Sequence, residues 1–151
     1  IQSLDLLGRK VLGNNGATLK KFGKIVGALI AEEGVNEKMA EFINPLAYLA
    51  DQMTKFTTEL GFKGFQNPDE VGAAAVDYLR VAGHLVFGYF WARMAQTALR
   101  EIAAGNADPF YLAKVQTARF YFAKLFPETA TLMRTARSGS RALMDTDAAL
   151  A

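Results

Sequence analysis

The chain has 151 residues, of which 51% are hydrophobic and 21% charged, a composition that excludes intrinsic disorder and fits one domain with its own core. Seventeen Lys and Arg residues against fifteen Asp and Glu residues give a net charge of +2, too balanced to indicate a nucleic-acid partner. The absence of Cys excludes disulfides and thiolate metal sites and fits a reducing, cytoplasmic location.

Two helices are predicted before residue 35. Residues 1–13 carry Leu4, Leu7 and Val11 at helical spacing, and we interpret them as a short linking helix that the Asn14-Asn15-Gly16 turn ends. The chain starts without Met, which indicates that an upstream part is missing. A second helix is expected over about 17–33, closed by Gly34. Its apolar positions are Leu19, Phe22, Val26 and Leu29, and its opposite side carries Lys20, Lys21 and Lys24.

A third helix is predicted to begin after Asn36, which can cap it. The spacing of its inward positions alternates four and three, as in helical bundles: Met39, Ile43, Leu46, Ala50, Met53, Thr57 and Leu60. Pro45 leaves two alternatives, a kink in one helix or a new helix capped by Asn44. Residues 61–66 are expected to form a loop.

The fourth helix is predicted to start at Asn67-Pro68-Asp69-Glu70 and to extend to about residue 104. We expect its apolar stripe at Val76, Leu79, Gly83, Phe87, Phe90, Met94, Ala98 and Ile102. Residues 81–92 are apolar on nearly every side, which predicts the central, most enclosed helix. This run is shorter than the ~20 residues that a transmembrane helix needs.

The fifth helix is predicted to begin at Asp108-Pro109 and to end before Pro127, and a last helix should cover about 128–137. The buried seam of the fifth helix is expected at Tyr111, Val115, Ala118, Phe122 and Leu125. The sequence therefore predicts an all-α, antiparallel bundle of about four major helices with short flanking helices. Residues 1–13 would be the linker, 14–144 the bundle domain and 145–151 a frayed tail.

The residue pattern indicates no catalytic, cofactor-binding or metal site. His84 is the single histidine, and because Val81 stands where a di-iron Glu-x-x-His pair needs Glu, that class is excluded. His84 is interpreted as a hydrogen-bonded histidine in a buried helix, with a role as a base or pH switch as the alternative. Four glutamates around one helix boundary are interpreted as a solvated face: Glu32, Glu33, Glu37 and Glu41.

Two kinds of side chain are candidates for binding. Arg134, Arg137 and Arg141 would share a helix face if the helix continued past Gly139, and they could then contact an anionic group such as the phosphates of a nucleotide-like ligand. The alternative is a solvated polar face. The fourth and fifth helices carry more aromatic residues than one buried seam between them needs, which favours a domain or subunit interface. The candidates are Trp91, Tyr89, Phe120 and Tyr121.

Five segments stand out by their sequence: residues 1–10 (IQSLDLLGRK), 89–95 (YFWARMA), 110–114 (FYLAK), 117–122 (TARFYF) and 125–129 (LFPET). They resemble a branch of the bacterial acyl-CoA dehydrogenases, the 3-methylmercaptopropionyl-CoA dehydrogenase-like enzymes. Residues 1–10 are similar to the stretch that follows the catalytic loop of that branch, and the other four segments resemble its additional C-terminal helical domain. The order and spacing of these segments make the resemblance specific over nearly the whole chain.

The resemblance implies a parent flavoprotein that dehydrogenates an acyl-CoA at the α,β positions with a glutamate base and FAD. That glutamate would lie just before Ile1-Gln2, so this chain would be inactive alone and bind no FAD. Its implied partners are the upstream dehydrogenase core, the acyl-CoA substrate of the parent and further copies in a homo-oligomer, without nucleic acid or a transmembrane segment. With this resemblance, Arg134, Arg137 and Arg141 become candidates for contact with CoA. Two alternatives stay open: a free-standing helical dimerisation module, and a bundle that binds an acyl or other apolar ligand.

Overall fold

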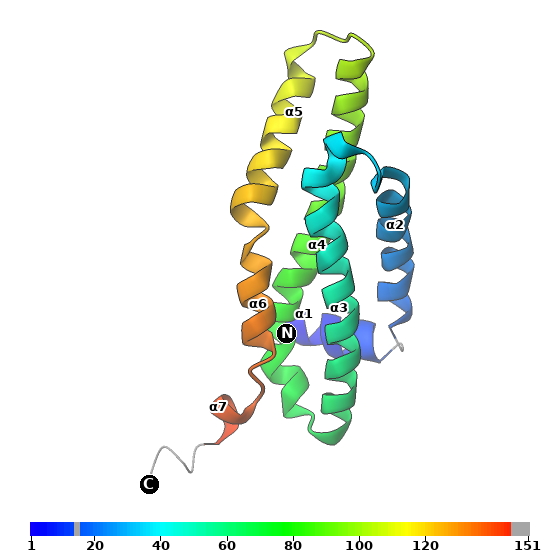
Figure 1. The fold of residues 1–151 in the computed structure, drawn as a ribbon. Helices are drawn as coiled ribbons and strands as arrows, with labels where there is room; N and C mark the ends of the chain where they lie inside the picture. Colours follow the sequence, from blue (N-terminus) through cyan, green and yellow to red (C-terminus); the bar gives the residue numbers. More distant parts are fainter. Residues whose placement is uncertain (14–15, 146–151) are drawn as a thin grey trace.

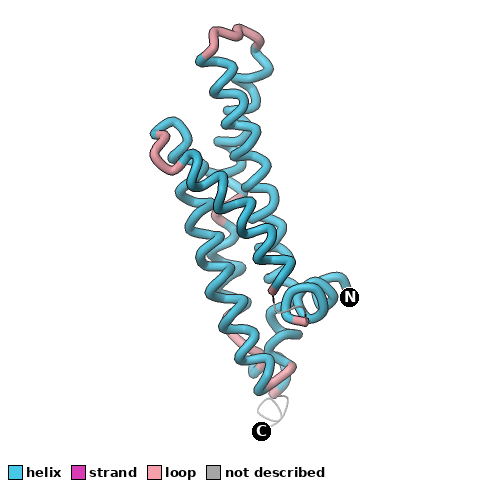
Figure 2. The backbone as a smooth tube through the Cα atoms, turned by 90° about the vertical axis from the view of Figure 1, so that its right-hand side faces the viewer, coloured by secondary structure: helices cyan, strands magenta, loops and turns pink. Residues whose placement is uncertain are grey.

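The computed structural model describes residues 1–13 and 16–145, and within these residues all regular structure is helical. The long elements are α2 (Ala17–Glu33), α3 (Ala40–Gln66), α4 (Asp69–Ala103) and α5 (Pro109–Phe120), which continues through the π-helical turn η3 (Tyr121–Leu125) into α6 (Glu128–Ala136). Neighbouring arms run antiparallel, joined by short loops (Figures 1 and 2). The predicted all-α bundle is confirmed.

Short elements flank this bundle at both ends. At the start, α1 (Gln2–Leu4) leads into the π-helical segment η1 (Asp5–Leu12), which packs against α4 and α2. Leu7 and Val11 of η1 are buried in the common core, as their spacing predicted, whereas Leu4 is half exposed. The 3₁₀ turn η2 (Glu37–Met39) precedes α3, and α7 (Arg141–Met144) follows α6.

Helix α2 has the predicted bounds and the predicted apolar side. It begins after Gly16, whose φ of 71° lies in the left-handed region, and ends at Gly34. Val26 and Leu29 are buried, and Leu19 and Phe22 pack partly on the core. Asn14 and Asn15, to which the turn was assigned, lie outside the described residues.

Helix α3 is longer than the sequence predicted. Asn36 caps the 3₁₀ turn η2 that leads into α3, since the Lys38 N–H donates to the Asn36 side chain at 3.2 Å. Helix α3 then runs through Pro45. A new helix capped by Asn44 is therefore wrong. The loop expected at 61–66 is also wrong, because α3 continues to Gln66 before Asn67 turns extended.

Gly64 lies where this last part of α3 meets α4 most closely. A Cβ atom at Gly64 would collide with Val71 of α4, whereas one at Gly61 would lie 3.6 Å from the Leu12 side chain, an ordinary contact. Gly64 therefore lets α3 approach α4 closely, and this packing outweighs the low helix propensity of the glycines.

Helix α4 is the centre of the bundle, with α3, the α5–α6 arm and the α1–η1 segment packed around it (Figure 1). Asn67 caps its start by accepting the Asp69 N–H at 3.1 Å, and Gly105 (φ 87°) follows its end, both as predicted. The predicted apolar stripe is wrong, because Val76, Phe87 and Phe90 are exposed. The buried face is instead rich in small residues: Ala74, Ala75, Tyr78, Val81, Leu85, Gly88, Ala92, Ala95, Gln96 and Ala98.

Gly88 lies where α4 meets two neighbours most closely. A Cβ atom there would come 2.7 Å from the Phe126 ring and 3.3 Å from Leu46 Cδ1. We expect Gly88→Ala to lower the free energy of unfolding in urea by about 1–2 kcal/mol, because the buried ring must shift. Gly83→Ala is the matched control in the same helix, since its Cβ would meet nothing within 4 Å. Gly83→Ala should raise stability by up to about 1 kcal/mol, and equal effects of both changes would contradict this close packing.

The α5–α6 arm begins as predicted, with the Asp108 side chain accepting the Phe110 N–H at 2.9 Å. Val115, Ala118 and Phe122 are buried as expected, and Tyr111 is half-buried. Leu125 is a wrong prediction: η3 widens the helix by one residue per turn, so Phe126 is buried and Leu125 is 47% exposed. Residues 146–151, most of the predicted frayed tail, lie outside the described residues.

Candidate interaction surface

An apolar stripe runs along α4 on the side opposite its buried face. We define the α4 stripe as Val76, Gly83, Phe87, Phe90 and Met94, which recur every three to seven residues and so share one face of the helix. Val76 and Phe87 are each 61% exposed and Phe90 is 53% exposed. At 1.5 Å per residue the stripe is about 27 Å long. Large exposed apolar patches mark interaction sites, so this stripe is the candidate interaction surface.

The four aromatic residues predicted for an interface have different environments. Phe120 on α5 is 57% exposed, whereas Tyr121 is buried within its own domain. Trp91 is half-buried and stacks on Tyr121 at 6.3 Å between ring centroids, and Tyr89 meets Phe22 of α2 edge-on at 5.8 Å. Tyr121 therefore offers no surface to a partner, and an interface role for the other three stays a prediction.

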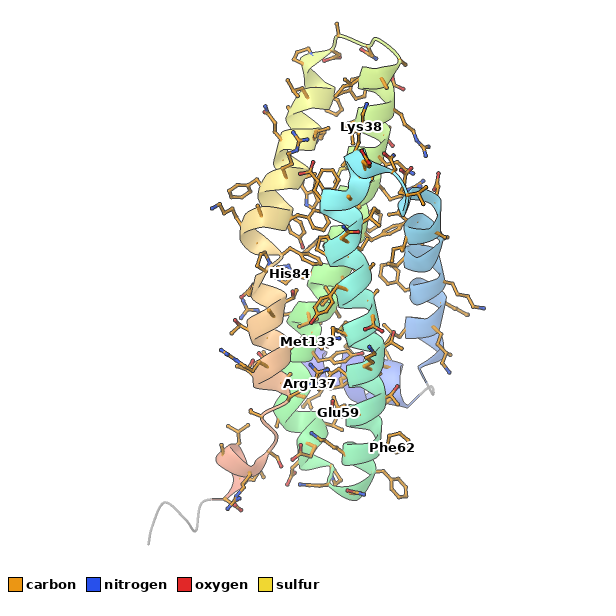
Figure 3. The ribbon with its side chains drawn as sticks, viewed as in Figure 1. Lys38, Glu59, Phe62, His84, Met133 and Arg137 are labelled. Atoms are coloured by element: carbon orange, nitrogen blue, oxygen red, sulfur yellow. The ribbon has the colours of Figure 1, made fainter. Side chains whose placement is uncertain are left out.

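The three candidate arginines do not share a helix face. Helix α6 ends at Ala136, and Gly139 (φ 82°) breaks the helix before Arg141. Arg137 Nε donates to Glu59 at 3.2 Å and its guanidinium lies 4.9 Å from the Phe56 ring centroid, between α6 and α3 (Figure 3). Arg141 pairs with Asp145 at 3.2 Å, and Arg134 is exposed. Contact with CoA stays a prediction.

The solvated face predicted for four glutamates is wrong for Glu33, which is 4% exposed. Its carboxylate accepts hydrogen bonds from Gln96 of α4, from Asn36 Nδ2 at 2.6 Å and from Arg100 at 2.8 Å. Burial raises the pKa of Glu33, but these hydrogen bonds outweigh burial and hold the pKa below its ordinary value. Because the C-terminal end of α2 carries Glu33, this cluster fastens α2 to α4.

The other three glutamates are solvent-accessible. Glu37 is exposed. Glu32 pairs with Arg100 at 2.8 Å, and Glu41 pairs with Arg119 of α5 at 2.9 Å. Exposed pairs of this kind contribute at most about 1 kcal/mol each.

His84 is a hydrogen-bonded helical histidine, as predicted. Its Nε2 lies 3.0 Å from Glu128 of α6, and its Nδ1 lies 3.0 Å from the Tyr121 hydroxyl of η3. The hydrogen bond from His84, together with the charge of Arg80, holds the pKa of Glu128 below its ordinary value. Burial raises the pKa of Tyr121 to about 12. Tyr121 is therefore neutral at physiological pH, and the three side chains hold the π-helical turn against α4.

The titratable side chains and the helix lengths of the described part of the chain bear on metal binding and on membrane insertion. Its His, Asp and Glu residues form no group of three or more that could hold a metal ion. None of the helices there combines the length and the hydropathy required to cross a membrane.

Comparison with known proteins identifies the family. The family model described as "Acetyl-CoA dehydrogenase C-terminal like" matches residues 18–147, which is most of the chain. The chain belongs to this family. The region matched by the family model spans α2 to α7 and contains the whole α4 stripe.

A curated relative supports the same assignment. The chain is 30% identical over 131 residues to the 3-methylmercaptopropionyl-CoA dehydrogenase of Ruegeria pomeroyi (strain ATCC 700808 / DSM 15171 / DSS-3). The match covers 85% of this chain but only 22% of the relative. This member of the dehydrogenase C-terminal family therefore corresponds to a minor part of that enzyme's length.

Sequence reasoning placed the α4 stripe on the wrong side of the helix and missed the Glu33 cluster. A signal for the stripe was present, because α4 is apolar all round and such a helix needs partners on every side. The Glu33 cluster had no such signal, since Gln96 and Arg100 are far from Glu33 in the chain.

Proposed function

We propose that this chain is the accessory C-terminal domain of an FAD-dependent acyl-CoA dehydrogenase and docks through the α4 stripe on the dehydrogenase region of the same polypeptide. The observation that carries the proposal is the exposed apolar row on the central helix α4, about 27 Å long from the helical rise. The family to which the chain belongs is named for its place in dehydrogenases. The rest of the relative's length, which this chain does not match, would supply the docking partner.

In this proposal the parent enzyme would remove a proton from the α carbon and a hydride from the β carbon of an acyl-CoA thioester, with a glutamate as the base and FAD as the hydride acceptor. We expect this domain itself to hold no FAD; in support, each buried side-chain N and O atom of the described residues already has a hydrogen-bond partner. The domain would thus supply packing, subunit contacts or part of the substrate entrance. Arg134 and Arg141 on the α6–α7 side are the candidates for contact with CoA.

Docking through the α4 stripe would remove large apolar side chains from water. Phe87 and Phe90 are each more than half exposed, and removing apolar surface from water contributes roughly 25 cal/mol per Å². Aromatic side chains at the centre of an interface contribute most to binding. A second copy of this chain could cover the same stripe, so the experiment must separate the two partners.

The test uses the longer dehydrogenase polypeptide that contains this chain. We expect Phe87→Ser/Phe90→Ser to separate the domain from the rest, seen as a new low-temperature unfolding transition and faster proteolysis between the two parts. Tyr48→Ser/Phe110→Ser is the matched control, because these two side chains are equally exposed but lie on α3 and α5. Identical melting of both variants would contradict docking through α4.

Two further measurements decide between this function and its alternatives. An assay over a panel of acyl-CoA substrates, with and without residues 1–151, should show activity that depends on the longer polypeptide. Sedimentation of the 151-residue chain alone would reveal dimers that Phe87→Ser/Phe90→Ser abolishes if the stripe serves self-association instead. Stoichiometric flavin in the isolated chain would overturn the accessory role.

A further inference from the structure

A groove of about 1350 Å³ lies between α2 and α3, away from the α4 stripe, and η1 lines one end of it. Its floor is apolar and buried, formed by Val26, Met53 and Leu85, which are at most 4% exposed. Gly8 and Gly23 keep it open, because a Cβ atom at either position would meet nothing within 4 Å. The volume exceeds the upper end of about 1,000 Å³ for common ligand pockets, so the groove suits a long ligand.

The groove is long enough for one hydrocarbon chain. Its α3 wall extends from Ala50 to Phe65, which at 1.5 Å per residue is about 22 Å. The hydrocarbon core of a bilayer, two acyl chains thick, measures about 30 Å, so one extended chain occupies about 15 Å and leaves length for its head group.

The polar side chains of the α3 wall are already satisfied. Thr54 donates to the Ala50 carbonyl at 2.9 Å and Thr58 to the Thr54 carbonyl at 3.0 Å. The Thr57 hydroxyl donates to the Met53 carbonyl at 2.7 Å. These hydroxyls therefore do not require a polar ligand, and their methyl groups are compatible with a hydrocarbon chain.

Positive charge is concentrated on the α2 side of the groove. Lys20 and Lys24 line it, and among the described residues neither has a carboxylate within ion-pair distance. Asp51 also lines the groove, but it is engaged by Lys55 at 2.7 Å. Ammonium groups beside an apolar floor match a ligand with an anionic head and an apolar tail.

We propose that this groove binds a single-chain anionic amphiphile of the fatty-acid class. The hydrocarbon chain would lie along Val26, Met53 and Leu85, with the carboxylate at Lys20 and Lys24. The proposal is independent of the docking role, because the groove and the α4 stripe lie on different sides of α4. Its test needs only the 151-residue chain and not the dehydrogenase region.

The first test blocks the groove from α2. Hexadecanoate is titrated, below its micelle concentration, into the chain and into Gly23→Leu, with binding measured by calorimetry. Gly23→Leu places a side chain in the groove without a clash and should weaken binding at least about tenfold. Gly27→Leu is the matched control: it has equal open space and the same gain in helix propensity, but Gly27 does not line the groove. The control should bind as the unchanged chain does.

The second test concerns the head group. Lys24→Glu should weaken hexadecanoate binding about tenfold, because a charge-assisted hydrogen bond is lost. Lys21→Glu makes the same charge change on the exposed side of α2, away from the groove, and should have little effect. Hexadecanol should bind more weakly than hexadecanoate. Absence of hexadecanoate binding, equal binding of the alcohol, or equal losses in Gly23→Leu and Gly27→Leu would each overturn the proposal.

Discussion

Replacing Phe42 by Ala is expected to lower the free energy of unfolding by about 3–5 kcal/mol, the usual cost of truncating a fully buried Phe. Phe42 is 0% exposed, and its ring lies 5.6 Å from that of Phe122. It therefore joins the start of α3 to the η3 turn in the middle of the α5–α6 arm, and Ala would leave a cavity between them. Urea unfolding followed by far-UV circular dichroism measures the change.

Phe65→Ala is the control for this prediction. Phe65 lies near the end of α3 and is 93% exposed, so its removal should change stability by no more than about 0.5 kcal/mol. If Phe42→Ala unfolded at the same urea concentration as Phe65→Ala, the buried position of Phe42 would be wrong.

Glu33→Gln is expected to lower the free energy of unfolding by about 2–3 kcal/mol at neutral pH. The change removes the charge from three hydrogen bonds, and each such bond to a charged group contributes about 1.5–3 kcal/mol when its partners are desolvated. Gln96 is itself 2% exposed, so its amide would lose its charged acceptor without gaining water. Urea unfolding at several pH values measures both the size of the effect and its pH dependence.

The pH dependence follows from the lowered pKa of Glu33. A carboxyl group whose pKa is lower in the folded than in the unfolded state stabilises the fold at pH values above its unfolded-state pKa. For Glu33 that ordinary pKa is 4.5. That stability is lost as the pH falls through the folded-state pKa. The unchanged chain and Glu33→Gln should therefore differ most above about pH 5 and converge in more acidic solution.

Glu32→Gln serves as the matched control. Glu32 is the preceding residue and shares Arg100, but its side chain is 46% exposed. Its neutralisation should cost at most about 1 kcal/mol, because solvent screens exposed ion pairs. Equal losses for Glu32→Gln and Glu33→Gln would show that burial of Glu33 is not the cause.

The domain carries two separate surfaces for which we propose binding. The α4 stripe is apolar, which suits a protein partner, whereas the groove between α2 and α3 is apolar at its floor and basic at its side. The Glu33 cluster holds the C-terminal end of α2 on α4. Loss of that cluster would thus disturb the groove and leave the α4 stripe in place.

The all-α class and most helix ends could be predicted from the residue pattern alone. Asn36, Asn67 and Asp108 each cap a helix through a side-chain acceptor that reaches a backbone N–H two residues ahead, so the signal is local and readable. The helical spacing in α2 was equally informative, because only one of its faces is apolar. The family resemblance was also readable and is confirmed by the match over residues 18–147.

Three features depend instead on how the helices pack: which side of α4 is buried, where α3 ends and which residues share the Glu33 cluster. An all-round apolar helix has no periodicity that selects a face, and the close approach at Gly88 depends on Phe126 from another arm. Glycines at 61 and 64 remain helical because η1 and α4 pack against them. The energies that settle these features come from contacts between residues distant in the chain, and no local pattern carries that information.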